Sequence, residues 1–378
     1  MALLLCFESQ FMRYFLILCL VSVVSSCAGR PDANVLRAIS TDEPSGKAVR
    51  TLVVSTRQED EKTKGFSTRR ASEVNYQAFT VSVPPAHKPG EIEWSATKPD
   101  PQKHFIVRQR DRLSRDSFLN EAFASAGPKK PLSVFVHGFN YNYQEAMLRG
   151  VQMAADARQS SNPIVFSWPS LASVTGYVGD KESATYSRDM LAALITDLTQ
   201  LKTPEKVVVF GHSMGGWLVM EALRQLRLQG KNDVLNRVHV VLAAPDIDVD
   251  VFNKQLDVIG RLNPPLTVLV SKDDRALQVS SFIGSDVVRV GAIDVENPQI
   301  RAEAIRKGVQ FIDISALDAS DPLNHDRYAS LAAVVPQLNR PQRGRGSPVG
   351  QAGAFVFDAI GATISSPFRL ASQVVNPR

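Results

Sequence analysis

The sequence predicts an α/β fold in which a mostly parallel, doubly wound sheet begins with antiparallel strands. Three observations support this prediction. Strand patterns alternate with helix patterns from residue 132 onward, three strand patterns follow one another before that point, and a glycine-flanked serine stands between a strand and a helix. Alternation is typical of a parallel sheet with helices on both faces. Consecutive strands without intervening helices favour antiparallel pairing.

The start of the chain resembles a secretory signal that ends at a lipid-accepting cysteine. Arg13 precedes the apolar run 14–24, which is shorter than the roughly 20 residues needed to span a bilayer. The run ends in Val-Ser-Ser-Cys, which resembles the lipobox of bacterial lipoproteins. We expect residues 1–26 to be cleaved as a lipoprotein signal peptide and Cys27 to carry the lipid, with an ordinary cleaved signal as the alternative.

The cysteine positions and the residue after the anchor extend this expectation. All three cysteines, Cys6, Cys19 and Cys27, lie in the leader. The mature chain would therefore hold neither an internal disulfide nor a thiolate metal site. Ala28 resembles the residue that sorts Gram-negative lipoproteins to the outer membrane. We expect a protein that is anchored there by its lipid and faces the periplasm.

Three segments follow the signal. Residues 27–50 are polar without a sustained period and predict a flexible tether. Residues 51–338 keep strand and helix patterns without a Pro/Gly-rich linker, which predicts one domain. Residues 339–378 form a basic tail, whose segment 355–364 could make an amphipathic helix at an anionic membrane, although we favour a disordered end.

Nine strand patterns make up the expected sheet. The first three cover residues 51–56, 76–83 and 104–109, and the later ones cover 132–136, 164–167, 207–210, 238–243, 267–270 and 309–314. Sites in such sheets lie beyond the carboxyl ends of the strands. The polar residues that follow these strands are therefore the candidates for chemistry.

The segment 211–215 reads Gly-His-Ser-Met-Gly and lies between an apolar strand and a helix pattern that contains Trp217. A sharp strand-to-helix turn holds a serine hydroxyl exposed, where an adjacent base can take its proton. Ser213 is therefore the candidate nucleophile, with a serine in an ordinary turn as the alternative. The turn also predicts an oxyanion loop before it, and an acid and a histidine after it.

The strand 132–136 runs into His-Gly-Phe-Asn at 137–140, which is the candidate oxyanion loop. A tetrahedral intermediate needs two backbone amides already aimed at its negative oxygen. We expect them to be the amides of Phe139 and Met214. His137 precedes the nucleophile, so the chain order assigns it a role in shaping the loop rather than in proton transfer.

The acid should end a strand downstream of the nucleophile. Asp274 follows the strand 267–270 and is the first choice, with the adjacent Asp273 as the fallback. Asp246 and Asp248 follow the preceding strand and form a second candidate pair, because the chain order alone does not fix the strand. Any of these carboxylates could instead cap a loop or a helix, which is a common use of aspartate.

Only two of the six histidines, His239 and His325, follow the nucleophile. His239 falls inside the strand 238–243, where a packed side chain is the simpler interpretation. His325 lies in a loop beyond the strand 309–314, and a loop gives a general base the freedom to reach the nucleophile. We assign the base to His325.

These motifs together resemble the α/β-hydrolases, and more narrowly a bacterial α/β-hydrolase subfamily of unassigned function. The resemblance covers most of residues 50–335 and shows no departure at the candidate triad. It is carried by residues 51–57, 81–87, 135–140, 166–170, 211–215, 244–248 and 271–277, and by His325. The resemblance implies the fold and a serine-hydrolase apparatus, but it implies no substrate.

Three further side chains could serve either a structural role or a role in binding substrate. Trp168 follows the strand 164–167 and would either line an acyl pocket or plug the core. Asp180 and Arg188 lie eight residues apart along the next helix pattern, which covers 181–198. They could pair with other groups or with substrate, but we expect them on a solvated helix face.

Composition excludes several classes of partner. No metal-ligand spacing and no phosphate-binding glycine loop occurs, so we expect no cofactor and no metal. The net charge of +5 suits an anionic envelope surface, but no aromatic-basic module accompanies it, so nucleic acid is not an expected partner. The oligomeric state and the natural substrate are left open, because pocket shape sets specificity.

The sequence therefore predicts a lipid-anchored serine hydrolase that cleaves an ester or similar acyl bond of a small molecule through an acyl-enzyme. In this prediction Ser213 attacks, His325 relays the proton and Asp274 orients the imidazole. Two alternatives stay open. One is a non-catalytic envelope protein that binds a ligand or partner on the same fold, and the other is an acyltransferase that uses the same triad.

Overall fold

The computed structural model describes residues 29–40, 46–95, 97–128, 130–159, 161–284 and 286–338. The expected signal peptide 1–26, the lipid-accepting Cys27 and the basic tail 339–378 lie outside the described residues. The chain divides into two units, Met1–Pro31 and Asp32–Arg378. All the elements described below belong to the second unit.

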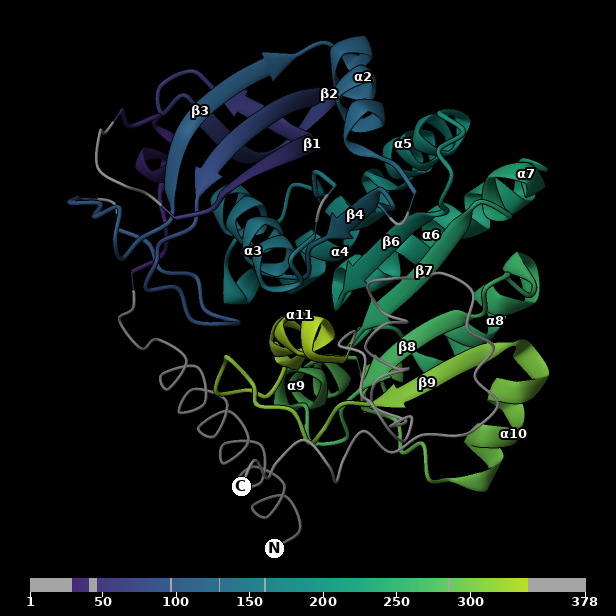
Figure 1. Ribbon diagram of the computed structural model, residues 1–378. Coiled ribbons are helices and arrows are strands. Elements are labelled where there is room, and N and C mark those ends of the chain that lie inside the picture. Colours follow the sequence, from purple (N-terminus) through teal and green to yellow (C-terminus); the bar gives the residue numbers. More distant parts are fainter. Residues whose placement is uncertain are drawn as a thin grey trace, which may run out of the picture. The chain divides into compact units, whose positions relative to one another are not determined.

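A nine-stranded sheet runs through the described residues, with the strand order β3-β2-β1-β5-β4-β6-β7-β8-β9 (Figure 1). The strands are β1 (Ala48–Asp60), β2 (Gly65–Ser82), β3 (Ile106–Leu113), β4 (Ser133–Val136), β5 (Ile164–Ser167), β6 (Val207–His212), β7 (Val238–Ala243), β8 (Leu266–Val270) and β9 (Val309–Asp313). β2 pairs antiparallel with both β1 and β3, while the other neighbours, including β1 and β5, pair parallel. The predicted architecture is confirmed.

Helices lie on both faces of this sheet (Figure 1). They are the 3₁₀ turns η1 (Ala33–Leu36), η2 (Val174–Gly176) and η3 (Val290–Ala292), and the α-helices α2 (Arg115–Ser125), α3 (Tyr143–Asp156), α4 (Tyr177–Tyr186), α5 (Arg188–Gln200), α6 (Met214–Leu228), α7 (Asn232–Leu235), α8 (Val249–Ile259), α9 (Arg275–Ile283), α10 (Pro298–Lys307) and α11 (Arg327–Leu338). α2, α5, α6 and α8 contribute to the core on one face. α3 and α11 contribute to the core on the other face.

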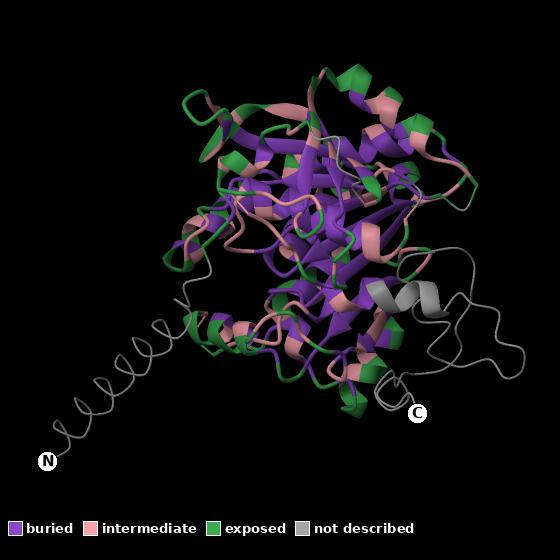
Figure 2. Ribbon diagram, turned by 60° about the vertical axis from the view of Figure 1, so that its left-hand side comes forward, coloured by how far each residue is buried: buried purple, intermediate pink, exposed green. Residues whose placement is uncertain are grey.

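Successive residues of the central strands serve opposite faces. In β7, Val240 and Leu242 join the core beneath α6, whereas Val241 joins the core beneath α3. Every residue of β7 is buried, as expected for a parallel strand that is covered on both sides. Buried residues accordingly extend through the sheet and the inner surfaces of the helices (Figure 2).

Part of the expected tether is ordered against the fold, so the prediction of a flexible segment over residues 27–50 is wrong there. η1 begins at an aspartate cap, Asp32, whose side chain accepts a hydrogen bond from the amide of Asn34. Leu36 is fully buried in the second core, and the amide of Ile39 donates to the carbonyl of Val107 at 2.9 Å. Burial of the apolar Leu36 side chain stabilises this segment against the fold, although its neighbours in the sequence are mostly polar.

The helix expected over residues 181–198 is two helices, α4 and α5, which meet at Ser187. The Ser187 hydroxyl lies 2.9 Å from the hydroxyl of Thr56 in β1 and is fully buried. α4 also starts earlier than predicted, at Tyr177. This earlier start places Tyr177 and Asp180 on a helix that packs beside the candidate site.

Candidate active site

Ser213 occupies a strained turn between β6 and α6. Its backbone has φ 54° and ψ −121°, a conformation that a residue with a side chain rarely adopts. Three hydrogen bonds hold it there, because the Ser213 amide donates to Ala243 at 2.9 Å and its carbonyl accepts from Gly216 at 2.9 Å and from Asp246 at 3.2 Å. Strain of this kind persists only when the surroundings over-determine the backbone, and it is concentrated at functional sites.

Two glycines allow the loops around this serine to approach one another. A Cβ atom on Gly215 would lie 2.3 Å from the Val136 carbonyl oxygen and 2.4 Å from that of His137. A Cβ atom on Gly138 would lie 2.9 Å from Nδ1 of His212 and 3.0 Å from Cβ of Ser213. The candidate oxyanion loop therefore lies directly against the Ser213 turn, and both contacts require glycine.

His325 and Asp274 lie side by side at the ends of later strands. Nδ1 of His325 is 2.7 Å from Oδ2 of Asp274, whose side chain is fully buried. Oδ1 of Asp274 accepts from the Leu277 amide at 2.9 Å and so caps α9. The two interpretations of this aspartate, helix cap and partner of the histidine, are thus both satisfied, one by each oxygen.

The loop that carries His325 is stabilised by hydrogen bonds to another aspartate, Asp321. Oδ1 of Asp321 accepts from the His325 amide at 2.8 Å and from the Asp326 amide at 2.7 Å. Burial acts to lower the pKa of His325, but the charge and hydrogen bond of Asp274, with smaller contributions from Asp326 and Asp321, raise this pKa above its ordinary value. The site therefore stabilises a positive charge on His325.

His212, which precedes the serine, packs against both His325 and the core residue Tyr328. Its ring lies 4.7 Å from the His325 ring and 4.2 Å from the Tyr328 ring, measured between centroids. Burial, and then the charge of His325, hold the pKa of His212 well below its ordinary value. A neutral His212 adds no competing positive charge beside His325.

The other candidate acids face different partners. Asp273 forms a two-pronged ion pair with Arg327, at 2.7 and 2.8 Å. Asp246 is buried, accepts from the hydroxyl of Tyr177 at 2.8 Å and from that of Ser280, and lies 3.4 Å from Nε of Arg289. Asp248 caps α8. Of the four candidate acids, Asp274 is the one for which a contact with His325 is found.

His137 holds the shape of the candidate oxyanion loop, as the chain order predicted. Its Nδ1 lies 2.9 Å from the carbonyl oxygen of Gly138, its Nε2 lies 3.2 Å from that of Trp168, and its ring stacks on Trp168. Burial, followed by the charge of Arg57, lowers the pKa of His137 to about 3. Trp168 is fully buried and donates to the His137 carbonyl at 2.7 Å, so it is a core residue.

The expected oxyanion donors come from two different segments, the loop after β4 and the start of α6. Met214 is the first residue of α6, so its amide belongs to the positive end of a helix. The ring of Phe139 packs edge-on against Tyr177, with 5.5 Å between centroids. The next residue, Asn140, has a φ of 62° and turns the loop back toward α3.

The sequence did not predict the buried positions of two residues in this region. Asp180, expected on a solvated helix face, is fully buried, and it accepts hydrogen bonds from Ser170 and from the Leu171 amide at 2.6 Å each. Arg57 received no role, yet its guanidinium is buried and bonded to the loops around the site. The available signal for Arg57 was its position as a charged residue directly after the strand pattern 51–56.

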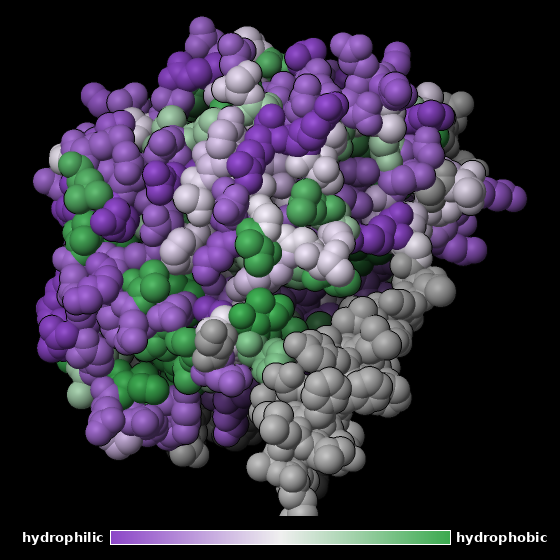
Figure 3. Space-filling view, turned by 180° about the vertical axis from the view of Figure 1, so that it is seen from behind, coloured by the Kyte–Doolittle hydropathy of each residue, from purple (hydrophilic) through white to green (hydrophobic). Residues whose placement is uncertain are grey.

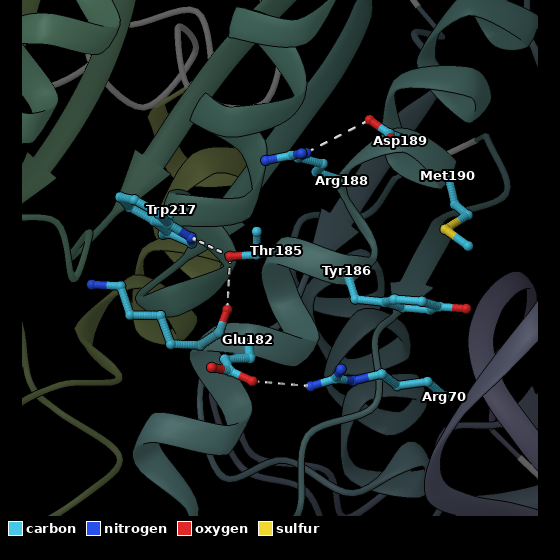
Figure 4. Close-up of a pocket in the computed structure, with 9 residues that line it drawn as sticks. Arg70, Glu182, Thr185, Tyr186, Arg188, Asp189, Met190 and Trp217 are labelled. Carbon is cyan, nitrogen blue, oxygen red and sulfur yellow. Dashed lines mark hydrogen bonds and ion pairs between the residues drawn. The ribbon is translucent and has the colours of Figure 1, made fainter.

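An open hollow of about 660 Å³ lies beside the first turns of α6, between β2, α4 and α5 (Figure 4). Trp217, one helical turn after Ser213, forms part of its wall, and Nζ of Lys181 lies 4.6 Å from the Trp217 ring. Arg70 and Arg188 in its wall lie 3.9 Å from Glu182 and 3.7 Å from Glu221. Because carboxylates already lie close to its guanidinium groups, we assign no ligand to this hollow.

In the part of the chain that the structure describes, no three His, Cys, Asp or Glu side chains come together in a group that could hold a metal ion. The helices of that same part all fall short of the length and apolar character that crossing a membrane requires.

The sheet, with its strained serine turn and the Asp274–His325 pair beyond its later strands, defines an α/β-hydrolase. The chain belongs to the family described as alpha/beta hydrolase of unknown function (DUF900), which matches residues 113–342. This match confirms the resemblance found in the sequence.

Individual relatives are more remote. An uncharacterized protein of Nostoc sp. is 41% identical over 61 residues, which are 16% of this chain and 16% of that protein. A putative hydrolase from Agrobacterium vitis aligns with 69% of this chain and 93% of its own at 14% identity and a TM-score of 0.31. A lipase-esterase related protein from Clostridium acetobutylicum aligns with 56% and 95% at 14% identity and a TM-score of 0.29. Similarity at this level transfers neither substrate nor mechanism.

Proposed function

We propose that this protein is a serine hydrolase that cleaves an ester or similar acyl bond through an acyl-enzyme. One observation carries the proposal. Nδ1 of His325 lies 2.7 Å from the buried carboxylate of Asp274, which follows the carboxyl end of β8. The strained Ser213 turn follows the carboxyl end of β6 in the same sheet. The family and the fold support a hydrolase, and this geometry favours the serine type.

In the acylation step, Oγ of Ser213 attacks the acyl carbon while Nε2 of His325 takes the hydroxyl proton. The carbonyl electron pair moves onto oxygen, and the amides of Phe139 and Met214 receive that negative oxygen. When the intermediate collapses, His325 returns its proton to the leaving alcohol. Asp274 holds the imidazole in the required tautomer and favours its charged form.

Water completes the cycle by the same route. His325 takes a proton from the water as the water oxygen attacks the acyl carbon, and it then returns the proton to Oγ of Ser213 as the acid leaves. The raised pKa of His325 helps the ring to accept each proton in turn. The positive end of α6 adds a favourable dipole beside the oxyanion.

Labelling with a fluorophosphonate probe tests this proposal, because the probe modifies an activated serine. We expect the folded protein to be labelled and Ser213→Ala to lose the label. Ser213→Ala and His325→Ala should each lower kcat on p-nitrophenyl esters by several orders of magnitude with little loss of folded protein, since a triad acts as a unit. Turnover that survives either change at near the original rate would refute the triad.

The same experiments separate the two alternatives. A folded protein that takes no label favours the non-catalytic binding protein. A labelled protein whose product yield with an added alcohol or amine exceeds the yield with water is an acyltransferase. A panel of p-nitrophenyl esters of rising acyl length would then define the substrate class.

We also propose that Cys27, which lies outside the described residues, anchors the enzyme in the outer membrane facing the periplasm. The support is the sequence of the leader. Cys27→Ser should move the protein out of the membrane fraction and abolish labelling by radioactive palmitate, while esterase activity persists. A Cys27→Ser protein that stays in the membrane fraction would contradict this anchor.

A further inference from the structure

Two buried residues of opposite charge are hydrogen-bonded to the loop that carries Phe139. Arg57 comes from the end of β1 and is 1% exposed, while Asp180 comes from the first turn of α4 and is 0% exposed. Charged side chains are almost never fully buried unless their charge is compensated. Both side chains form hydrogen bonds to the same two loops.

Arg57 binds backbone carbonyls on two loops at once. Its Nη2 donates to the carbonyl of Tyr141 at 2.8 Å, two residues after Phe139. Its Nη1 donates to the carbonyl of Ser170 at 3.0 Å, in the loop that follows β5. A guanidinium has its donors fixed in a rigid fork, so Arg57 sets the distance between these two loops.

Asp180 binds the same two loops through their donors. Its Oδ2 accepts from the Asn140 amide at 3.3 Å and from the Ser170 hydroxyl at 2.6 Å, and its Oδ1 accepts from the Leu171 amide at 2.6 Å. Ser170 is therefore bonded to both charges, through its carbonyl to Arg57 and through its hydroxyl to Asp180. The cation and the anion hold one loop pair from two sides.

We infer that Arg57 and Asp180 are positioning residues that aim the amide of Phe139 at the oxyanion. They take up the Asn140 amide and the Tyr141 carbonyl, the backbone groups that follow Phe139 in the loop. The Phe139 amide belongs to the Gly138–Phe139 peptide, whose carbonyl oxygen lies 2.9 Å from Nδ1 of His137. With that contact on one side and the bonds of Arg57 and Asp180 on the other, this peptide has little freedom to rotate. The inference rests on the proposed serine-hydrolase function and names residues that act through the loop rather than on the substrate.

The expected loss of kcat depends on how precisely the Phe139 amide must point at the oxyanion. Removal of an oxyanion donor typically lowers kcat by about 10²–10³-fold, and a displacement of about 1 Å can cost about 10²-fold. A loosened clamp leaves the donor present but badly aimed. We therefore expect Arg57→Lys and Asp180→Asn to lower kcat by about 10- to 100-fold, with KM changed less than about threefold.

A merely structural role would not produce a selective loss of transition-state affinity, so the decisive measurement uses an analogue. Ser213 adds to a trifluoromethyl ketone and its proton passes to His325, which leaves a negative oxygen at the oxyanion position. Affinity for this ketone should fall in each variant by the same factor as kcat/KM. Fluorophosphonate labelling of the unmodified protein is measured first, because an unlabelled protein overturns the proposed function and this inference with it.

Arg237 supplies the matched control. It also binds two backbone carbonyls, that of Thr199 in the last turn of α5 at 3.1 Å and that of Thr203 in the loop after α5 at 2.7 Å, but it lies just before β7, at the amino end of the strands. Arg237→Lys should lower the melting temperature without changing kcat or analogue affinity. An equal loss of analogue affinity in Arg237→Lys would overturn the inference, because it would show a general effect of loosening loops.

A milder variant covers the case in which both charge variants fail to fold. Ser170→Ala removes the hydrogen bond to Asp180 and the one that the hydroxyl accepts from the Ala172 amide, and it leaves both buried charges in place. We expect its analogue affinity to fall several-fold with KM unchanged. The inference is overturned if the folded labelled variants, or Ser170→Ala where it alone folds, bind the ketone as tightly as the unmodified protein does.

Discussion

Two buried aspartates follow adjacent strands of the sheet, yet their carboxylates face different partners. Asp246, after β7, donates its backbone amide to the Ser213 carbonyl and turns its carboxylate to Tyr177, Ser280 and Arg289. Asp274, after β8, turns its carboxylate to His325. Residue type and position at a strand end are therefore equal, and the difference lies entirely in the partner.

The two carboxylates therefore differ in what they can do. The Asp246 carboxylate is bound by a tyrosine, a serine and an arginine, and none of these three partners is a histidine that could act as a general base. The Asp274 carboxylate has one oxygen in a helix cap and the other on an imidazole. We expect substitutions at these two positions to separate stability from activity.

The largest expected effect is that of Asp274→Asn on turnover. An asparagine can still cap α9 through its oxygen, but its amide group would donate to Nδ1 of His325 and place the ring proton on Nε2. The base would then be in the wrong tautomer, which lowers kcat by about 10⁴-fold in a well-studied triad. Steady-state hydrolysis of a p-nitrophenyl ester measures this loss.

Asp246→Asn should instead act on stability. The change leaves Arg289 buried without its carboxylate, and breaking a buried pair of this kind costs about 3–5 kcal/mol. We expect the free energy of unfolding, measured with urea, to fall by about that amount while kcat falls less than about tenfold. If Asp246→Asn abolishes turnover and Asp274→Asn does not, the acid is Asp246 and our assignment is wrong.

The dependence of activity on pH sharpens the comparison further. His325 acts as a base only when neutral, so kcat/KM should rise with pH through the pKa of His325, which Asp274 holds above its ordinary 6.5 against the effect of burial. In Asp274→Asn the residual activity should rise at a pH lower by about one unit or more, because burial then dominates. A rising limb that stays in place would show that Asp274 does not set this pKa.

The smallest expected effect is that of Tyr177→Phe. This change removes the hydroxyl that binds Asp246 and Ser280, and it keeps the ring that packs on Phe139. Loss of such a hydrogen bond costs about 1–2 kcal/mol of unfolding free energy, and we expect kcat to stay within about threefold. A much larger fall in kcat would place the Asp246 cluster in the catalytic machinery.

Some features of the fold and of the candidate site could be predicted from the sequence, and others could not. The parallel strands, the serine turn, the base candidate His325 and the loop-shaping role of His137 follow from signals spanning a few residues, namely apolar runs, glycine turns and chain order. The ordered η1 segment and the buried Asp180 do not, because short polar stretches look the same whether they face solvent or a distant partner. Arg57 and Tyr141 are 84 residues apart, and no local pattern links them.

The sequence by itself determined the class of fold, the serine turn and the short list of candidate acids, because backbone propensities and turn chemistry act locally. The tertiary structure decided which aspartate meets His325 and which charges hold the loop that carries Phe139. These choices depend on strand order, which inserts β1 beside β5 and sets β8 next to β7. A hydrogen bond forms only between groups about 3 Å apart, and that proximity is a property of the packed sheet rather than of any segment.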